Sequence, residues 1–147
     1  MRLLLLGLIT LMFFTSAMVP STKAITGKWK TIDDETEKAK SVVLLYKKEG
    51  KLYGKVIKLF RAPSEEQNPM CDECEGAKHN KPIIGMQIIN GLEYDDGEWE
   101  GDDGILDPNN GKVYDCKMWV DEDNSDILNV RGYISFLYRT QTWHRVK

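Results

Sequence analysis

The feature that most limits the fold of this chain is its division into short β-rich runs, one about every 10–12 residues, with turn residues between them. None of the segments has the period of a convincing amphipathic helix. Eight or nine consecutive short strands indicate an all-β domain. An antiparallel up-and-down β-barrel of about eight strands is the favoured form, because closure removes exposed sheet edges. The main runs are 24–32, 40–48, 51–60, 82–89, 112–120, 126–135 and 137–146.

Turn residues between the runs give the expected connections. Glu49-Gly50 predicts a hairpin between 40–48 and 51–60, and Asn90-Gly91 predicts a tight turn that ends the run 82–89. The glycine-broken segment 92–107 predicts two short strands, around 98–100 and 104–106. Asp107 opens the sequence DPNNG, where an Asx turn is favoured over a role as general acid or base.

The first 24 residues have the order of a secretory signal peptide. Arg2 precedes an apolar run that extends to about Val19, and Thr22-Lys23-Ala24 supplies small residues at a cleavage site. An uncleaved membrane anchor is the alternative, because the run is nearly as long as the roughly 20 residues that span a bilayer. We expect cleavage near Ala24 and one domain over 25–147, located in the periplasm or secreted.

The charge of that domain argues against nucleic acid as a partner. Without Arg2 and Lys23, 18 of the 20 basic residues remain against 23 acidic ones, a formal charge of −5. No basic stripe follows the chain, which a phosphate backbone would require. After cleavage, we expect a chain that does not span a membrane.

Cys71 and Cys74 form a C-x-x-C motif with three possible meanings. Export favours a local disulfide, which leaves Cys116 as a buried free thiol. A zinc site made of the three cysteines and His79 is an alternative, but it needs a distant strand to reach the loop. A thioredoxin-like centre is less favoured, because the motif lies in an acidic loop and opens no helix. We expect no metal and no cofactor.

The two ends of the domain carry a pattern that resembles the closing device of lipocalins and their calycin relatives. Gly27-x-Trp29 lies in the first run, and Trp143 and Arg145 lie in the last. The resemblance implies that the indole of Trp29 packs under the closed end of the barrel and that Arg145 lies across its ring. Such a cation–π contact contributes about 0.5–2 kcal/mol.

The whole domain also resembles a narrower group of exported bacterial proteins, DUF2147. The resemblance implies a compact lipocalin-like barrel exported by Gram-negative bacteria, and it implies no function. The sequence departs from the family's pattern at ISFLY (134–138), where a glycine-rich corner is expected. The motifs that carry the resemblance are GKWKTID (27–33), GKLYGKVIKLF (50–60), C-x-x-C followed by KPIIGMQII (81–89), GILDPNNGKVYDCKM (104–118), LNVRGYI (128–134) and RTQTWHRV (139–146).

No catalytic motif is present, so we expect a binding protein and not an enzyme. If Trp143 and Arg145 face the core, strand alternation places Arg139 and Gln141 on the same face toward the open end. Tyr114 and Met118 share a face of the run 112–120 and would supply apolar walls. These four residues predict a site for a small amphipathic or anionic molecule. The alternative is a structural or envelope-interaction module, with a barrel filled by its own side chains and Arg139 paired internally.

Overall fold

The computed structural model describes residues 24–147 of the 147-residue chain. The predicted leader lies outside the described residues apart from Ala24. Within the described part, no helix is long and apolar enough to cross a membrane. The elements are β1 (Gly27–Ile32), β2 (Ala39–Lys48), β3 (Lys51–Leu59), the 3₁₀ helix η1 (Gly76–Lys78), β4 (Gln87–Asp95), β5 (Glu98–Asp107), β6 (Lys112–Val120), β7 (Ile127–Ile134) and β8 (Leu137–Arg145).

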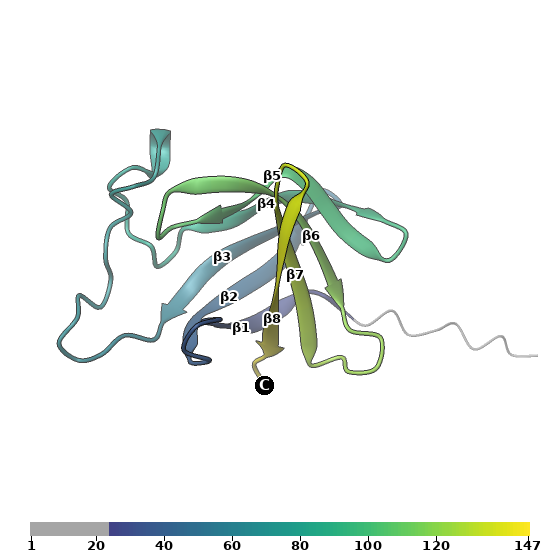
Figure 1. Cartoon of the computed structure of the whole chain (residues 1–147), viewed down its shortest axis with the longest axis horizontal. Helices are drawn as coiled ribbons and strands as arrows, with labels where there is room; N and C mark the ends of the chain where they lie inside the picture. The colour runs from purple at the N-terminus through teal and green to yellow at the C-terminus, as the bar shows by residue number, and fades with distance from the viewer. Residues whose placement is uncertain (1–23) are drawn as a thin grey trace, which may run out of the picture.

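The eight strands form one closed barrel in sequence order, as expected from the sequence. Each strand is antiparallel to the next, and Figure 1 shows them wrapping round in turn, with the long β3–β4 connection projecting at the left. β8 closes the barrel on β1 through the pairs Trp29–Arg145 and Lys30–His144. The described part of the sheet therefore has no open edge, which removes the aggregation risk that exposed edges carry.

Two expected hairpin features are present. Glu49 and Gly50 connect β2 to β3 with φ of 52° and 77°, which is the backbone form that a two-residue turn between twisted strands favours. At Asp107, the side-chain Oδ1 accepts a hydrogen bond of 2.9 Å from the Asn109 backbone N–H, which is an Asx turn.

Two expected strand boundaries are wrong. β4 begins at Gln87 and runs through Asn90-Gly91, where the sequence predicted a turn. Gly91 has a φ of 62°, and the pairing of β4 with β5 shifts register in this region, so the dipeptide forms an irregularity within the strand. β5 is one strand, Glu98–Asp107, where two short strands were expected, and its register shift lies after Gly101.

Side chains fill the barrel at the end where the chain enters β1. Gly54 allows the close packing there, because a Cβ at this position would lie 2.6 Å from Leu45 and 2.9 Å from Ile89. This filled end positions the site, since it leaves the opposite end of the barrel as the place for a cavity. The fully buried side chains of the filled end include Trp29, Leu45, Leu52, Ile89, Leu92, Met118 and Leu128.

Arg145 lies across Trp29 at the filled end. Its guanidinium carbon is 4.2 Å from the centre of the buried indole ring. The same guanidinium donates hydrogen bonds to the backbone carbonyls of Ala24 (2.8 Å), Thr26 (3.3 Å) and Ser125 (3.0 and 3.1 Å). It therefore joins the residues just before β1, the β6–β7 connection and the last strand. Trp143, which is also in β8, is buried. A Cβ added at Gly27 would lie 3.5 Å from the Nη1 of Arg145.

Candidate functional site

A cavity of about 600 Å³ opens at the barrel end opposite Arg145. Its deeper walls are apolar and come from several strands. Trp143 contributes to this wall and is 2% exposed, and its indole nitrogen is buried without a hydrogen-bond partner among the described residues. The apolar lining away from the opening includes Ile88 of β4, Ile105 and Leu106 of β5, Val130 of β7 and Trp143 of β8. A cavity of this size and character is within the range of small-molecule sites, about 300–1,000 Å³.

The rim of the cavity is polar. The hydroxyls of Thr31 and Ser41 are hydrogen-bonded to each other at 2.7 Å, and both residues are buried. Asp34, in the β1–β2 connection, forms an ion pair with Arg139 and accepts a hydrogen bond of 3.1 Å from the Gln141 side-chain amide. An amphipathic molecule would therefore meet apolar atoms inside and hydrogen-bonding groups at the opening.

The rim of the cavity carries more negative charge than the sequence suggested. Each of its two cations has an aspartate beside it: Arg139 pairs with Asp34, and Lys40 lies 3.9 Å from Asp33. Hydrogen bonds from the Thr36 backbone and hydroxyl lower the pKa of Asp33, which keeps this carboxylate charged at neutral pH. Glu35 and Asp107 also line the opening.

Three of the four residues expected to bind a ligand line this cavity, and one does not. Arg139, Gln141 and Tyr114 are in its wall or rim. Arg139 was expected in the interior, but its side chain is 67% exposed at the opening. Met118 is on the same face of β6 as Tyr114 but lies deeper, where it is fully buried in the filled end.

Gly132 is a cavity residue that the sequence analysis missed. It lies in the middle of β7, and a Cβ added there would meet no atom within 4 Å. The missing side chain therefore contributes to the open volume. A signal was present, because a glycine inside a strand pattern often marks a close approach by a ligand or another backbone. Asp34 was missed as well, since nothing in a polar loop indicates which of its carboxylates will turn toward the barrel.

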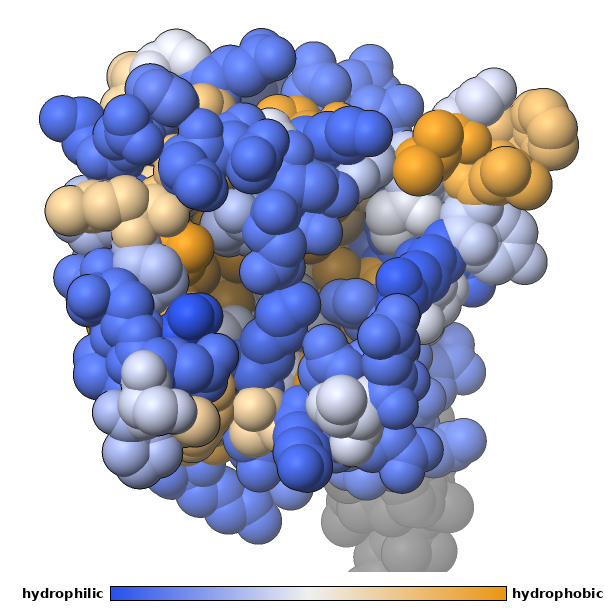
Figure 2. All heavy atoms as spheres, turned by 60° about the vertical axis from the view of Figure 1, so that its left-hand side comes forward, coloured by the Kyte–Doolittle hydropathy of each residue, from blue (hydrophilic) through white to orange (hydrophobic). Residues whose placement is uncertain are grey.

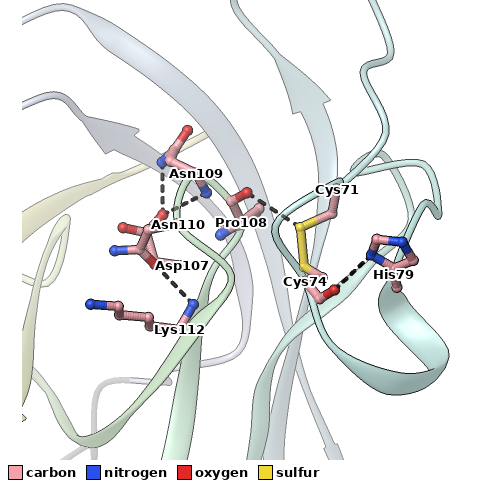
Figure 3. The surroundings of a disulfide bond; sticks show 8 residues. All are labelled: Cys71, Cys74, His79, Asp107, Pro108, Asn109, Asn110 and Lys112. Atoms are coloured by element: carbon pink, nitrogen blue, oxygen red, sulfur yellow. Dashed lines mark hydrogen bonds between the residues drawn. A yellow bond between two sulfur atoms is a disulfide. The ribbon is translucent and has the colours of Figure 1, made fainter.

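The disulfide loop packs beside the opening. Cys71 and Cys74 are joined, as expected, and both are buried. Figure 3 shows them against the turn that connects β5 to β6, where the Cys71 sulfur lies 3.3 Å from the carbonyl oxygen of Pro108. A disulfide sulfur carries no hydrogen, so this is a packing contact. At Gly111 of the same turn, an added Cβ would overlap the Glu73 carbonyl. The loop is thus seated directly on the turn.

The disulfide removes Cys71 and Cys74 as thiolate ligands, so the zinc alternative loses two of its four groups. The Nδ1 of His79 lies 3.0 Å from the Cys74 carbonyl oxygen. Across residues 24–147, no group of three or more His, Cys, Asp or Glu side chains is placed to hold a metal ion.

Cys116 is free and buried, and burial raises its thiol pKa to about 12. The thiol is therefore protonated at neutral and mildly alkaline pH. We expect the native protein not to react with Ellman's reagent at mildly alkaline pH, and the unfolded, non-reduced protein to release one thiol per chain. Three thiols per chain under these conditions would show that the disulfide is absent, and rapid reaction of the native protein would contradict the burial of Cys116.

The sequence model of a bacterial family, described as "Uncharacterized protein conserved in bacteria (DUF2147)", matches residues 27–145. This match extends from the first residue of β1 to the last of β8. The chain belongs to this family. No curated protein matches the DUF2147 chain.

A solved structure has the same fold as this DUF2147 barrel. Protein HP1028 from the human pathogen Helicobacter pylori, which is described as belonging to the lipocalin family, matches with a TM-score of 0.69. The match covers 84% of each chain at 17% sequence identity. At this identity the likeness concerns the fold alone, which is a lipocalin-like barrel.

Proposed function

We propose that this DUF2147 protein binds a small amphipathic molecule in the cavity at the open end of its barrel. The observation that carries the proposal is the 600 Å³ cavity itself, with apolar walls inside and a polar rim. A barrel of eight strands can be filled by its own side chains or can hold one small ligand. Here one end is filled and the other is open, which favours a ligand over a purely structural barrel.

The charges at the rim favour an uncharged polar group on the ligand over an anionic one. An anion would have to displace Asp34 from Arg139 and would also face Asp33, Glu35 and Asp107. Hydrogen-bonding groups that need no displacement are the hydroxyls of Thr31 and Ser41. Of the two ligand classes expected from the sequence, the amphipathic one therefore fits the site better.

Binding, and not catalysis, is the proposed activity. None of the described residues that line the cavity is a histidine or a cysteine. The Ser41 hydroxyl is bonded to Thr31, so it has no adjacent base to activate it as a nucleophile. For location, the leader pattern of residues 1–24 and the Cys71–Cys74 disulfide support export to the periplasm or beyond.

Filling the cavity at Gly132 tests the proposal. The Gly132→Phe side chain would enter open space, because nothing lies within 4 Å of the new Cβ and the backbone has no positive φ there. Thr142→Phe is the matched control, since it adds the same side chain to an exposed position on the outer face of β8. We expect phenylnaphthylamine, an uncharged amphipathic fluorophore, to bind the wild type and the control. Gly132→Phe should weaken its binding about tenfold or more, which corresponds to about 1.4 kcal/mol or more.

Fluorescence titration measures this binding, and unfolding curves establish that each variant is folded. If the folded Gly132→Phe protein binds the fluorophore as well as the wild type does, the ligand is not in the cavity. If the wild type binds neither this fluorophore nor any other amphipathic probe, the structural alternative is favoured.

A further inference from the structure

The tip of the β7–β8 hairpin is apolar and projects from the barrel. Ile134 pairs with Leu137, so the turn consists of Ser135 and Phe136, and Ser135 has a φ of 57°. Figure 2 shows an apolar knob at the upper right of an otherwise largely hydrophilic face, where this hairpin is turned into profile. The exposed fractions of the tip side chains are 63% for Ile134, 87% for Phe136, 63% for Leu137 and 63% for Tyr138.

This clustering separates the tip from ordinary exposed hydrophobic residues. Single exposed apolar side chains are normal on soluble proteins, whereas a contiguous group marks an interaction site. Phe60, Val113 and Tyr94 are also exposed, but they belong to separate elements of the fold. Four large side chains within five consecutive residues are a different case.

The residues behind the tip follow an order that matches the polarity of a bilayer surface. Next to the Ile134–Leu137 pair comes Tyr133 paired with Tyr138, whose rings are 6.0 Å apart. The following two pairs bring in Arg139, which is paired with Asp34, and Arg131. With a rise of about 3.3 Å per residue, the arginines lie about 7–10 Å behind the tip. The hairpin therefore presents apolar side chains first, aromatic rings next and basic groups last. This is the order of polarity from the acyl region of a bilayer to its phosphates.

Arg131 is a cation without an acidic partner among residues 24–147. Its Nε donates to the Thr140 hydroxyl at 2.8 Å. The guanidinium carbon lies 4.4 Å from the Tyr138 ring centre and 5.0 Å from that of Trp119, which holds the group on the outer face of the hairpin. Its remaining N–H groups are suited to lipid phosphate, which an arginine binds through paired hydrogen bonds.

We propose that the β7–β8 tip docks this protein onto a lipid bilayer by inserting Phe136, Leu137 and Ile134 into the interfacial region. The tip is convex, so it fits a deformable apolar layer and needs no preformed pocket. Acidic side chains, including Asp115 and Glu100, line a hollow that Tyr133 and Ser135 border. Together with the formal charge of −5 without residues 1–24, they oppose attraction to anionic lipid, so the binding depends on insertion and varies little with salt.

Docking at this tip would bring the cavity to the bilayer. Ile134, Leu137 and Tyr138 line the cavity opening as well as forming the knob. An amphipathic molecule could then pass between the bilayer and the barrel without crossing water. This consequence rests on the proposed function, whereas docking itself does not.

Vesicle co-sedimentation tests the docking. Protein purified after expression of the full chain is mixed with phosphatidylcholine vesicles, and intact mass establishes whether residues 1–24 remain, because an apolar leader would itself bind lipid. We expect Phe136→Ser combined with Leu137→Ser to lower the partition coefficient about tenfold or more. The control is Phe60→Ser combined with Met70→Ser, which removes two exposed apolar side chains elsewhere and should leave binding unchanged.

A tryptophan placed at the tip gives a second readout. Phe136→Trp should show a blue-shifted emission with vesicles and quenching by brominated acyl chains, and Phe60→Trp should show neither. Failure of the wild type to sediment with vesicles, or equal sedimentation of the tip variant, would overturn the proposal. It would also be overturned if the tip variant converts a wild-type dimer to a monomer without any vesicle binding, because the tip would then contact a second copy. The single variant Phe136→Ser separates this proposal from the proposed function, because Phe136 does not line the cavity: it should weaken docking and leave phenylnaphthylamine binding unchanged.

Discussion

Replacing Arg145 by lysine should lower the free energy of unfolding by about 2–4 kcal/mol although the positive charge is kept. Arginine combines a planar stack on the Trp29 ring with hydrogen bonds to the carbonyls of Thr26 and Ser125, which cleavage after Ala24 leaves in place. A lysine ammonium has no plane to stack on the ring while it also bonds both of these carbonyls. The strand pairing between β1 and β8 is short, so the loss should act at the point where the barrel closes.

Urea unfolding of the wild type, Arg145→Lys and Arg61→Lys measures this effect. Arg61 has an exposed ion pair with Glu65, four residues along, and its replacement should change stability by less than about 0.5 kcal/mol. An Arg145→Lys midpoint equal to that of the wild type would show that the stack and the carbonyl contacts do not hold the barrel ends together.

Gly111→Ala should destabilise the protein by about 2–4 kcal/mol, for two reasons that can be separated. Gly111 has a φ of 69°, which alanine adopts at a cost of about 1–2 kcal/mol. In addition, the new Cβ would overlap the Glu73 carbonyl and lie 2.8 Å from the Cys74 backbone nitrogen. Relief of this overlap requires the disulfide loop to lift off the β5–β6 turn.

Gly50→Ala is the matched control for the backbone strain. Gly50 has a φ of 77°, and a Cβ there meets nothing within 4 Å, so this variant should show the strain alone. The difference between the two variants in the free energy of unfolding, from urea curves, measures how much the packing of the disulfide loop on the β5–β6 turn contributes to stability. Reduction of the Cys71–Cys74 disulfide by dithiothreitol should also be faster in Gly111→Ala than in Gly50→Ala. Equal stability and equal reduction rates for the two variants would mean that the loop does not rest on the turn.

The fold followed from local sequence rules wherever a local interaction decides the structure. The Glu49-Gly50 turn, the Asx turn at Asp107 and the C-x-x-C disulfide each depend on residues a few positions apart. Asn90-Gly91 shows the limit of such rules. The same dipeptide that favours a tight turn also allows the positive φ of an irregularity within a strand, and pairing with β3 and β5 on both sides decided in favour of the strand.

The sequence predicted which face of the strands the site residues lie on, but not how far each residue lies from the barrel opening. Strand alternation placed Tyr114, Met118, Arg139 and Gln141 on the inner face of the barrel. How far each lies from the opening depends on the stagger of the strands, which the alternation does not contain. Met118 is therefore in the filled end and Arg139 at the exposed rim. The pairing of Arg139 with Asp34 joins positions that are over one hundred residues apart, and no local pattern indicates it.

Native mass spectrometry of the protein purified from the cells that produce it tests whether the cavity holds a ligand. We expect a non-covalent adduct of small-molecule mass on the wild type and on Thr142→Phe, and its loss or marked reduction on Gly132→Phe. An uncharged amphipathic compound should be released from that adduct. A wild-type protein that carries no adduct under gentle conditions, or an adduct equally abundant on folded Gly132→Phe, would contradict the claim that the cavity is a ligand site.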